Sequence, residues 1–429
     1  MYALVDINGA FVAMEMVFRP GDRDKPGVVL SNGDGCIIAA NKIAKELPGF
    51  VMYSPAFQME AILNMYNVLR FSPNFEYYVD MSRRFITELS YFSDKVEMYS
   101  IDEAFMDLNI QNVDLTQYGH IIRKTILKNL DLPVGIGIAP TKALCKVASR
   151  IAKKYLDRTN GVFVIDSEYK RERALKWLKI SDVWGIGSRY AKKLISMNVQ
   201  TAYDFTQLPD SWVLRNMTVV GMRLKQELQG TPCLELNEVF EPKKEIGTAK
   251  AFGSLITDYA LIREACCSYI EYCAGKLRRQ KSVASAILVS LETNSFRLQD
   301  EQYNCSTVMT LPVASNDNPT LIKYACLALN NIFKPGFKYK RVGVSLIGLF
   351  PDTHIQTNLF SPTNPNNIMV QKVVDRLNAK YEENTVRIAS SGYNRKHWES
   401  KAEIRSPRAT TRWNEILTIT DVLDRKINS

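Results

Sequence analysis

The order of short apolar segments in the first 155 residues constrains the fold of this chain more than any other feature. Five segments have the alternation or apolar run of β-strands: residues 2–7, 27–32, 96–101, 103–108 and 133–139. Helices are predicted through Lys45, after the second strand, and over 115–130 and 140–155. The order is close to β-α-β-β-α-β, the split βαβ or ferredoxin-like pattern. It predicts an α+β fold with an antiparallel sheet that carries its helices on one face.

Two acidic residues, Asp102 and Glu103, stand side by side where the strands 96–101 and 103–108 meet. Two carboxylates about 4 Å apart repel each other by roughly 4 kcal/mol at an effective dielectric constant near 20, so a cation is expected beside them. Asp6, at the end of the first strand, would reach the same edge of the sheet. Three acids without a histidine form an oxygen cage that suits Mg²⁺, and a pair of Mg²⁺ ions assists in-line phosphoryl displacement. The alternatives are a strand-end turn at Asp6 and an exposed hairpin tip at Asp102 and Glu103.

Composition narrows the class of protein. Lys and Arg exceed Asp and Glu by 10, which favours a polyanionic partner. The eight cysteines include no Cys-x-x-Cys pair and the three histidines are far apart, so spacing predicts neither a zinc site nor disulfides. No apolar run reaches the length of a membrane span, and the apolar start lacks a basic leader. We therefore expect a cytoplasmic protein without a membrane segment.

The rest of the chain divides into segments of different character. A short helical region, 171–237, contains Gly185 and Gly187 in a tight turn directly before a basic helix. Such a turn offers backbone N–H groups to a phosphate, although a plain helix-helix turn is an equal alternative. The charged segment 238–250 is expected to be a linker, and residues 251–350 again alternate helix and strand, which predicts a second α+β domain.

Basic residues gather at three places. Four of them lie at helical spacing in the helix 140–155, namely Lys142, Lys146, Arg150 and Lys153. In the second domain they form two clusters, Lys276, Arg278, Arg279 and Lys281, and Lys334, Lys338, Lys340 and Arg341. Charge runs are usually solvated faces, but two clusters in one small domain equally favour binding to a nucleic-acid backbone.

Several motifs, taken in order, resemble those of the Y-family, lesion-bypass DNA polymerases, and in particular the UmuC-type branch that forms the catalytic subunit of bacterial DNA polymerase V. They are Asp6-Ile7-Asn8 with Phe11 and Glu15, VFRP (17–20), SNGDGC (31–36), YSIDEAFMDL (99–108), VGIGIAPTKALCKVASRIAKK (134–154), DVWGIG (182–187) and SFRL (295–298). This resemblance covers essentially the whole chain, and its Ser-Ile-Asp-Glu-Ala-Phe-x-Asp-Leu motif is highly specific.

The resemblance implies a right-hand polymerase with a palm and small fingers in 1–170, the fingers being about 11–75. A helical thumb would follow in 171–237, then the linker 238–250, a little-finger domain in 251–350, and a clamp-binding peptide with a C-terminal tail in 351–429. The implied activity is error-prone translesion DNA synthesis in the SOS DNA-damage response of a bacterium, in association with DNA.

The resemblance also assigns roles to residues. It implies that Asp6, Asp102 and Glu103 are the catalytic carboxylates and, with the Ile7 carbonyl, the ligands of two Mg²⁺ ions. Phe11 would be the steric gate that excludes a ribose 2′-OH. Nucleotide phosphates would be contacted by Lys45 and Lys153, and primer-template DNA by Gly185, Gly187, Lys276, Arg278, Arg279, Lys338, Lys340 and Arg341.

Near the C-terminus, Gln356-Thr357-Asn358-Leu359-Phe360 resembles the clamp-binding pentapeptide of this family, with Gln356, Leu359 and Phe360 as anchors. Its alternative is a loop with two apolar residues. The tail SPRATTRWNEIL (406–417) resembles that of the UmuC branch, which implies a UmuD-type accessory protein as a partner, together with a RecA filament.

The chain departs from the family pattern at three positions. Ala10 stands where a second aromatic residue is usual, and Ala40 and Ile43 replace an arginine and a glutamate of the fingers. Lys42 could supply the lost cation, although a flexible point charge does not reproduce a guanidinium fork. Ala10 and Ala40 favour one alternative to the polymerase, a catalytically weakened DNA-binding scaffold. A second alternative is a two-metal nuclease, which would need a water-activating group but neither Phe11 nor Lys153.

Overall fold

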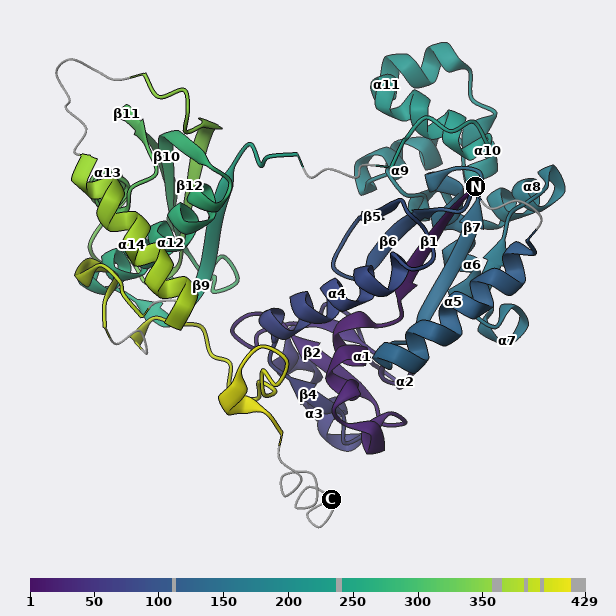
Figure 1. The fold of residues 1–429 in the computed structure, drawn as a ribbon, viewed down its shortest axis with the longest axis horizontal. Helices are drawn as coiled ribbons and strands as arrows, with labels where there is room; N and C mark the ends of the chain where they lie inside the picture. Colours follow the sequence, from purple (N-terminus) through teal and green to yellow (C-terminus); the bar gives the residue numbers. More distant parts are fainter. Residues whose placement is uncertain (110–112, 237–240, 357–364, 382–384, 394–396, 418–429) are drawn as a thin grey trace. The chain divides into compact units, whose positions relative to one another are not determined.

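The computed structural model describes residues 1–109, 113–236, 241–356, 365–381, 385–393 and 397–417 (Figure 1). The chain forms two compact units. The first consists of Met1–Ser31, Gly35–Phe240 and Ile404–Ser429, and the second of Asn32–Asp34 and Glu241–Glu403. The C-terminal region expected as one piece, 351–429, is therefore divided, because its last part belongs to the first unit.

The main sheet of the first unit has the strand order β5-β6-β1-β7-β8. Its strands are β5 (Val96–Met98), β6 (Glu103–Asp107), β1 (Tyr2–Ile7), β7 (Val134–Ala139) and β8 (Val162–Val164). Strand β1 is antiparallel to both β6 and β7, whereas β7 and β8 are parallel. The prediction of an antiparallel sheet is therefore wrong for the β7–β8 edge, where a helix connects the two strands.

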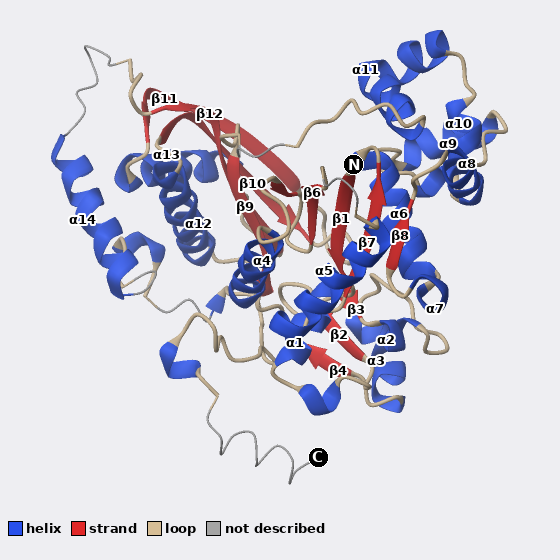
Figure 2. Cartoon of the chain, turned by 45° about the vertical axis from the view of Figure 1, so that its right-hand side comes forward, coloured by secondary structure: helices blue, strands red, loops and turns tan. Residues whose placement is uncertain are grey.

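Helices cover both faces of this sheet, so the prediction of helices on one face was wrong (Figure 2). On β1, Val5 packs in a core with α4 (Phe75–Leu89) and α5 (Leu115–Leu130), while Leu4 packs in another core with α6 (Lys142–Lys154). Gly137 of β7 makes the close approach of α6 possible. A Cβ atom at Gly137 would lie 2.1 Å from the backbone nitrogen of Ser149 on α6.

A small second sheet follows β1 and α1 (Ala10–Val17) in the sequence. Its order is β3 (Ile37–Ala40), β2 (Gly27–Leu30), β4 (Leu69–Phe71), and it packs with α2 (Lys42–Lys45) and α3 (Ala56–Met65) around Val28, Ile37 and Leu63. The short helix η1 (Pro20–Asp22) connects α1 to this sheet.

The segment 168–228 is helical, in keeping with the helical region predicted over 171–237. It contains α8 (Glu168–Trp177), η2 (Ile180–Asp182), α9 (Ser188–Ser196), α10 (Ala202–Thr206) and α11 (Asp210–Leu228), and the short helix α7 (Leu156–Thr159) precedes strand β8. Buried residues of this segment, such as Phe205 and Leu224, share a core with Leu144 and Val147 of α6. The helices of this segment are thus packed on the α6 side of the main sheet.

The second unit is an antiparallel sheet of order β11-β10-β12-β9 that buries one face under two helices. Its elements are β9 (Ile246–Ile256), α12 (Tyr259–Arg279), β10 (Ser282–Thr293), β11 (Asn304–Ser315), α13 (Asn318–Ile332), β12 (Tyr339–Pro351), α14 (Pro365–Tyr381) and η3 (Ala389–Ser391). Strand β9 begins at Ile246, so the last part of the expected linker 238–250 is strand. Helix α14 was not expected.

The C-terminal segment of the first unit contains η5 (Trp413–Glu415). Its backbone joins the unit at Ser72, whose N–H donates to the carbonyl oxygen of Ile404 over 3.1 Å. Among the described residues, no helix has both the length and the apolar character needed to cross a bilayer. All eight cysteines are free in this structure.

Candidate active site

The register of the main sheet brings the predicted acidic residues to one edge. Asp6 at the end of β1 lies opposite Glu103 at the start of β6. The N–H of Ile7 donates to the carbonyl oxygen of Asp102 over 2.9 Å. Strand β5 ends at Met98, so Asp102 lies in a turn and not at the junction of two strands as predicted. Its Oδ1 accepts a hydrogen bond from Ser100 Oγ at 2.6 Å.

The basic stripe predicted on α6 is present, and each of its cations is paired with a different acid. Lys153 pairs with Asp6, and Lys146 pairs with Glu103 at 2.5 Å. Two further pairs lie along the helix: Lys142 pairs with Glu97 one turn before Lys146, and Arg150 pairs with Asp182 at 2.9 Å between Lys146 and Lys153. The cations expected beside the carboxylates are therefore, in this structure, the ammonium groups of Lys146 and Lys153.

Burial and this pairing shift the pKa values of the two central acids in opposite directions. Burial, reinforced by the neighbouring Glu103, raises the pKa of Asp6 to about 7 despite the opposing effect of Lys153. Burial also acts to raise the pKa of Glu103, but the hydrogen bond with Asp6 and the ion pair with Lys146 outweigh it and hold that pKa below its ordinary value. Of these two acids, Asp6 is thus the one that takes up a proton first as the pH falls.

The donor types at this edge suit Mg²⁺, because they are carboxylate and carbonyl oxygens without histidine or cysteine. The side chains are not gathered as a finished metal cage, however. Within the described part of the chain, no three Asp, Glu, His or Cys side chains converge closely enough to hold a metal ion. Lys146 and Lys153 stand beside the acids instead, and their long stems would allow them to withdraw from an arriving cation.

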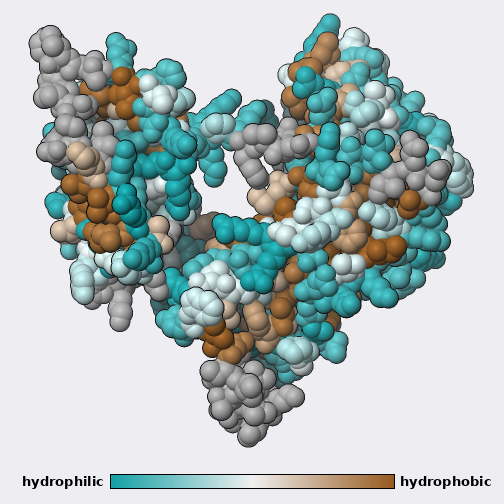
Figure 3. Space-filling view, in the orientation of Figure 1, coloured by the Kyte–Doolittle hydropathy of each residue, from teal (hydrophilic) through white to brown (hydrophobic). Residues whose placement is uncertain are grey.

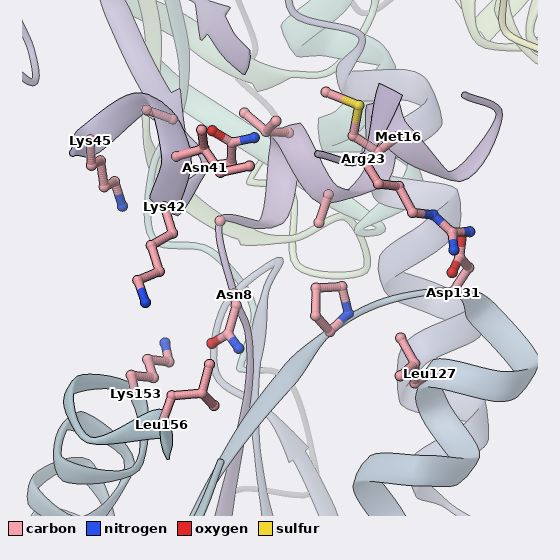
Figure 4. A pocket seen from close by; sticks show the side chains of 16 residues that line it. Asn8, Met16, Arg23, Asn41, Lys42, Lys45, Leu127, Asp131, Lys153 and Leu156 are labelled. Atoms are coloured by element: carbon pink, nitrogen blue, oxygen red, sulfur yellow. The ribbon is translucent and has the colours of Figure 1, made fainter. Parts of the chain in front are cut away.

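Two cavities meet at Lys153. The smaller one, about 310 Å³, is lined by both Asp6 and Glu103 together with Asp182. The larger one, about 570 Å³, is lined by Lys153 with Lys42 and Lys45 of α2, among others. Figure 4 shows Lys42 and Lys153 extending toward the same space. The structure therefore brings together the two lysines predicted to contact nucleotide phosphates, Lys45 and Lys153.

Asn8 also lines the larger cavity, and its role was not predicted from the sequence (Figure 4). Its side-chain Oδ1 is buried and has no hydrogen-bond partner. A buried amide oxygen without a partner is costly, and this oxygen is available to accept a hydrogen bond from a ligand. The only sequence signal was its place in the Asp-x-Asn motif.

Phe11 lies on α1 and is half-buried. Its ring stacks on the ring of Tyr78 with a centroid distance of 4.7 Å and an interplanar angle of 15°. Phe75 meets it edge-on at 5.9 Å. The preceding Ala10 is buried in the core between α1 and the main sheet, so there is little room for a larger side chain there.

The glycine turn predicted before a basic helix is present. Gly185 has a φ of 86°, a conformation that favours glycine, and Gly187 is the residue directly before α9. Trp184 beside it donates its indole N–H to the hydroxyl of Tyr99 over 2.9 Å. The turn is thus fixed against the segment that carries Asp102, whereas its contact with DNA stays a prediction.

In the second unit the predicted DNA-binding residues have unequal surroundings. Arg278 forms two hydrogen bonds with the carboxylate of Asp375 on α14 and two more with the Asn316 carbonyl oxygen and with Asn318. Its guanidinium is therefore committed to holding the unit together in this structure, which argues against our prediction that it binds DNA. Lys276 instead lies over the Tyr272 ring, 4.1 Å from its centroid.

The second basic cluster lies at the start of β12. The exposed Lys338 pairs with Asp300 at 3.1 Å, and the exposed Arg341 pairs with Glu292 at 3.7 Å. Lys340 donates to the carbonyl oxygen of Phe252 over 2.5 Å, and burial lowers its pKa. Exposed ion pairs of this kind exchange readily, so DNA binding by this cluster stays a prediction, as it does for Arg279.

The predicted clamp-binding peptide, 356–360, is only partly within the described residues. Gln356 is exposed. Leu359 and Phe360 lie outside the described residues.

Comparison with solved structures identifies the fold. The chain resembles a Y-family DNA polymerase chimera of Dbh and Dpo4 with a TM-score of 0.66 and 22% sequence identity, covering 82% of this chain and 99% of the chimera. The insertion ternary complex of Dbh DNA polymerase gives a TM-score of 0.51 over 82% of this chain and 99% of that chain, also at 22% identity. The fold is the α+β right-hand fold of the Y-family polymerases, with palm, fingers, thumb and little finger.

Comparison with protein sequences gives the family. Residues 5–150 match the impB/mucB/samB family, residues 243–359 its C-terminal domain, and residues 369–419 a domain of unknown function (DUF4113). Protein UmuC of Salmonella typhimurium is 39% identical over 98% of this chain and its own full length, and Protein ImpB of Salmonella typhimurium is 34% identical over 97% of this chain and 99% of its own. The chain belongs to the impB/mucB/samB family of UmuC-type Y-family polymerases, and it is a DNA-directed DNA polymerase.

Proposed function

We propose that this polymerase adds deoxynucleotides to a primer 3′-OH opposite damaged template bases, with low fidelity, in the bacterial SOS DNA-damage response. One observation carries the proposal: Lys153 lines both the cavity of the acidic edge and the cavity of the fingers lysines. A carboxylate site for metal ions and a basic site for a triphosphate are then adjacent. Nucleotide addition requires this arrangement, and a binding scaffold does not.

Asp6, Asp102, Glu103 and the Ile7 carbonyl would hold two Mg²⁺ ions. When bound, such ions stabilise the attacking and leaving oxygens of an in-line displacement. The chain's own residues bind and orient the substrate. Lys153 would exchange its partner, leaving Asp6 for the triphosphate, and Lys45 would contact the triphosphate from the fingers side.

The sugar and the base would be selected by shape. The half-buried Phe11 ring, supported by Tyr78, would form the floor of the sugar pocket and clash with a 2′-OH. The buried Asn8 oxygen, which has no protein partner, faces the same cavity as the lysines and can accept a hydrogen bond from the nucleotide. Deoxynucleotides are then preferred by steric exclusion.

Partners extend the proposal beyond the catalytic unit. Primer-template DNA would be contacted by the turn at Gly185 and Gly187 and by the exposed cations at the start of β12. The pentapeptide 356–360 would bind the sliding clamp. By its similarity to UmuC, we propose that the chain works in the bacterial cytoplasm with a UmuD-type accessory protein and a RecA filament.

The alternative of a weakened scaffold has specific residues behind it. Ala40 and Ile43, which replace charged residues of the family, both line the larger cavity and bring no charge to it. Against it, Lys42 lines the same cavity and brings a cation there.

Primer extension by the full chain with Mg²⁺ and the four dNTPs, on an undamaged template and on one with an abasic site, separates the possibilities. We expect the primer to lengthen on both templates. A primer that shortens would indicate the nuclease, and a primer that is bound but unchanged on both templates would support the scaffold.

A further inference from the structure

The C-terminal segment 404–417 satisfies buried polar groups of the first unit. Three polar side chains between α1 and α4 are almost completely buried: Ser72 is 0%, Asn74 1% and Glu15 2% exposed. Each of them hydrogen-bonds to this segment, at Ile404 or Ser406. Since a buried polar group without a partner is costly, the segment is an integral part of the unit and not a loose tail.

The side chain of Asn74 binds the C-terminal segment instead of capping a helix. Asn74 is the residue directly before α4, a position where asparagine usually caps the helix with its side-chain oxygen. Here it makes no capping bond. Its amide nitrogen instead donates to Ser406 Oγ at 2.9 Å and to the Ser406 carbonyl oxygen at 3.1 Å.

Ser406 also forms a hydrogen bond with Glu15. Its hydroxyl donates to Glu15 Oε1 over 3.0 Å, and the same oxygen accepts a hydrogen bond from the Tyr78 hydroxyl at 2.6 Å. Ser406 and Tyr78 therefore share one carboxylate oxygen of Glu15. The rotamer of Glu15 depends on both of them.

Tyr78 in turn supports Phe11. The two rings are stacked 4.7 Å apart, and the Tyr78 side chain is fully buried. A continuous series of contacts therefore connects Ser406 through Glu15 and Tyr78 to Phe11, the residue proposed as the floor of the sugar pocket.

A second, independent attachment holds the same segment. Arg408 pairs with Glu415 within it, at 2.9 Å from Nε, and reaches Glu76 in the first turn of α4 at 3.5 Å. Thr411 Oγ1 donates to Glu76 Oε1 at 3.1 Å. The segment can therefore stay attached when Ser406 is changed, which makes a clean test possible.

We propose that segment 404–417 positions the steric gate, with Ser406 as the positioning residue. This inference rests on the proposed function, because it takes Phe11 as the gate. Without the Ser406 hydroxyl, Glu15 loses one of the two donors that fix it, and the Tyr78 ring loses its fixed hydroxyl anchor. Phe11 can then tilt, and a ribose 2′-OH meets less resistance.

The test compares the efficiency of dNTP and rNTP incorporation by the full chain on primed DNA. Ser406→Ala should lower the dNTP/rNTP ratio roughly three- to tenfold, since one hydrogen bond shifts an equilibrium by about that factor. The dNTP efficiency itself should change little. Ser406→Thr keeps the hydroxyl and should retain the parent ratio, and Thr411→Ala is the matched control within the same segment.

The Phe11→Ala variant distinguishes a failure of the proposed gate residue from a failure of the role proposed for Ser406. If Phe11→Ala lowers the ratio and Ser406→Ala adds nothing in that background, the segment acts through Phe11. If Phe11→Ala leaves the ratio unchanged, the gate assignment in the proposed function fails. If Phe11→Ala lowers the ratio but Ser406→Ala does not, this inference alone is wrong.

Tyr78→Phe keeps the ring and removes only the hydroxyl that binds Glu15. It serves as a second variant if Ser406→Ala does not fold, and it should shift the ratio in the same direction. An unchanged ratio in a folded Tyr78→Phe protein would overturn the inference as well.

Discussion

Lys153 of α6 forms an ion pair with Asp6 at the end of β1, so a residue expected to bind a triphosphate is paired with a residue expected to bind metal. Lys153 thereby compensates the charge of the mostly buried Asp6 carboxylate whenever that group is ionised. If Lys153 binds the triphosphate as proposed, it exchanges its partner Asp6 for the nucleotide, and the two sites are coupled.

Lys153→Ala should therefore raise the KM for dNTP, by roughly ten- to a hundredfold if a charge-assisted contact is lost. Binding of primer-template DNA should stay close to that of the parent. The matched control is Lys154→Ala, the next residue of α6, whose ammonium lies over the Trp177 ring at 5.1 Å. Equal KM values for both variants would contradict the assignment of Lys153.

Ala10→Phe tests whether this chain could carry a second aromatic residue beside Phe11. Because Ala10 is buried in a packed core, the larger side chain should cost about 1–3 kcal/mol of the free energy of unfolding. We expect a lower midpoint in urea denaturation rather than a better dNTP/rNTP ratio. An unchanged midpoint would show that the core has room for the ring.

The raised pKa of Glu15 predicts that the stability of the protein depends on pH. Burial raises its pKa above the ordinary value of 4.5, against hydrogen bonds from Tyr78 and Ser406 and the positive charge of Arg19. The native state therefore binds more protons than the unfolded state just above pH 4.5, so this group makes the free energy of unfolding fall as pH rises through that range.

Glu15→Gln removes this titration. Urea denaturation between pH 4 and 8 should show that the stability of the parent, relative to the variant, declines as pH rises. A difference that is constant across the range would mean that Glu15 does not titrate anomalously.

The basic residues of the second unit should separate into two groups. Replacing Lys338, Lys340 and Arg341 with alanine should weaken binding of primer-template DNA and flatten its salt dependence. Arg278→Ala should instead lower stability, because Asp375 and Asn318 lose their buried partner. The measurements are the salt dependence of DNA binding and the unfolding midpoint of each variant. If Arg278→Ala keeps its stability but shows a reduced salt dependence, Arg278 is a DNA-binding residue after all.

The pentapeptide 356–360 should act only through the sliding clamp. Changing Gln356, Leu359 and Phe360 to alanine should remove clamp stimulation and leave distributive synthesis unchanged, because a tether works through effective concentration. Clamp stimulation that survives the triple change would refute this assignment.

The sequence predicted those elements whose pattern lies within a single short segment. Helix α5 has the predicted bounds, 115–130, because its apolar residues recur at helical spacing throughout. The alternation of glycine and isoleucine in β7 predicted the strand but not that α6 would pack on its glycine face. Strand β9 was missed because its first residues continue a charged, glycine-containing segment that is typical of a linker.

Contacts between distant segments could not be predicted. Glu15 and Ser406 are 391 positions apart, and no periodicity links them. A signal existed only on one side: a carboxylate inside the apolar helix Ala10–Val17 needs a buried partner. Likewise, the register that places Asp6 opposite Glu103 depends on strands β1 and β6, which are separated by the whole fingers region.

The central claim is that the acidic edge formed by β1 and β6 is the catalytic site. Single-nucleotide incorporation with Mg²⁺ by Glu103→Gln tests this claim most directly. Asp182→Asn is the matched control, because Asp182 lines the same cavity and also pairs with a cation of α6 but lies off the sheet edge. We predict that Glu103→Gln loses incorporation by roughly a hundredfold or more while it still binds primer-template DNA, and that Asp182→Asn remains active. Incorporation by Glu103→Gln at the rate of the parent would contradict the account.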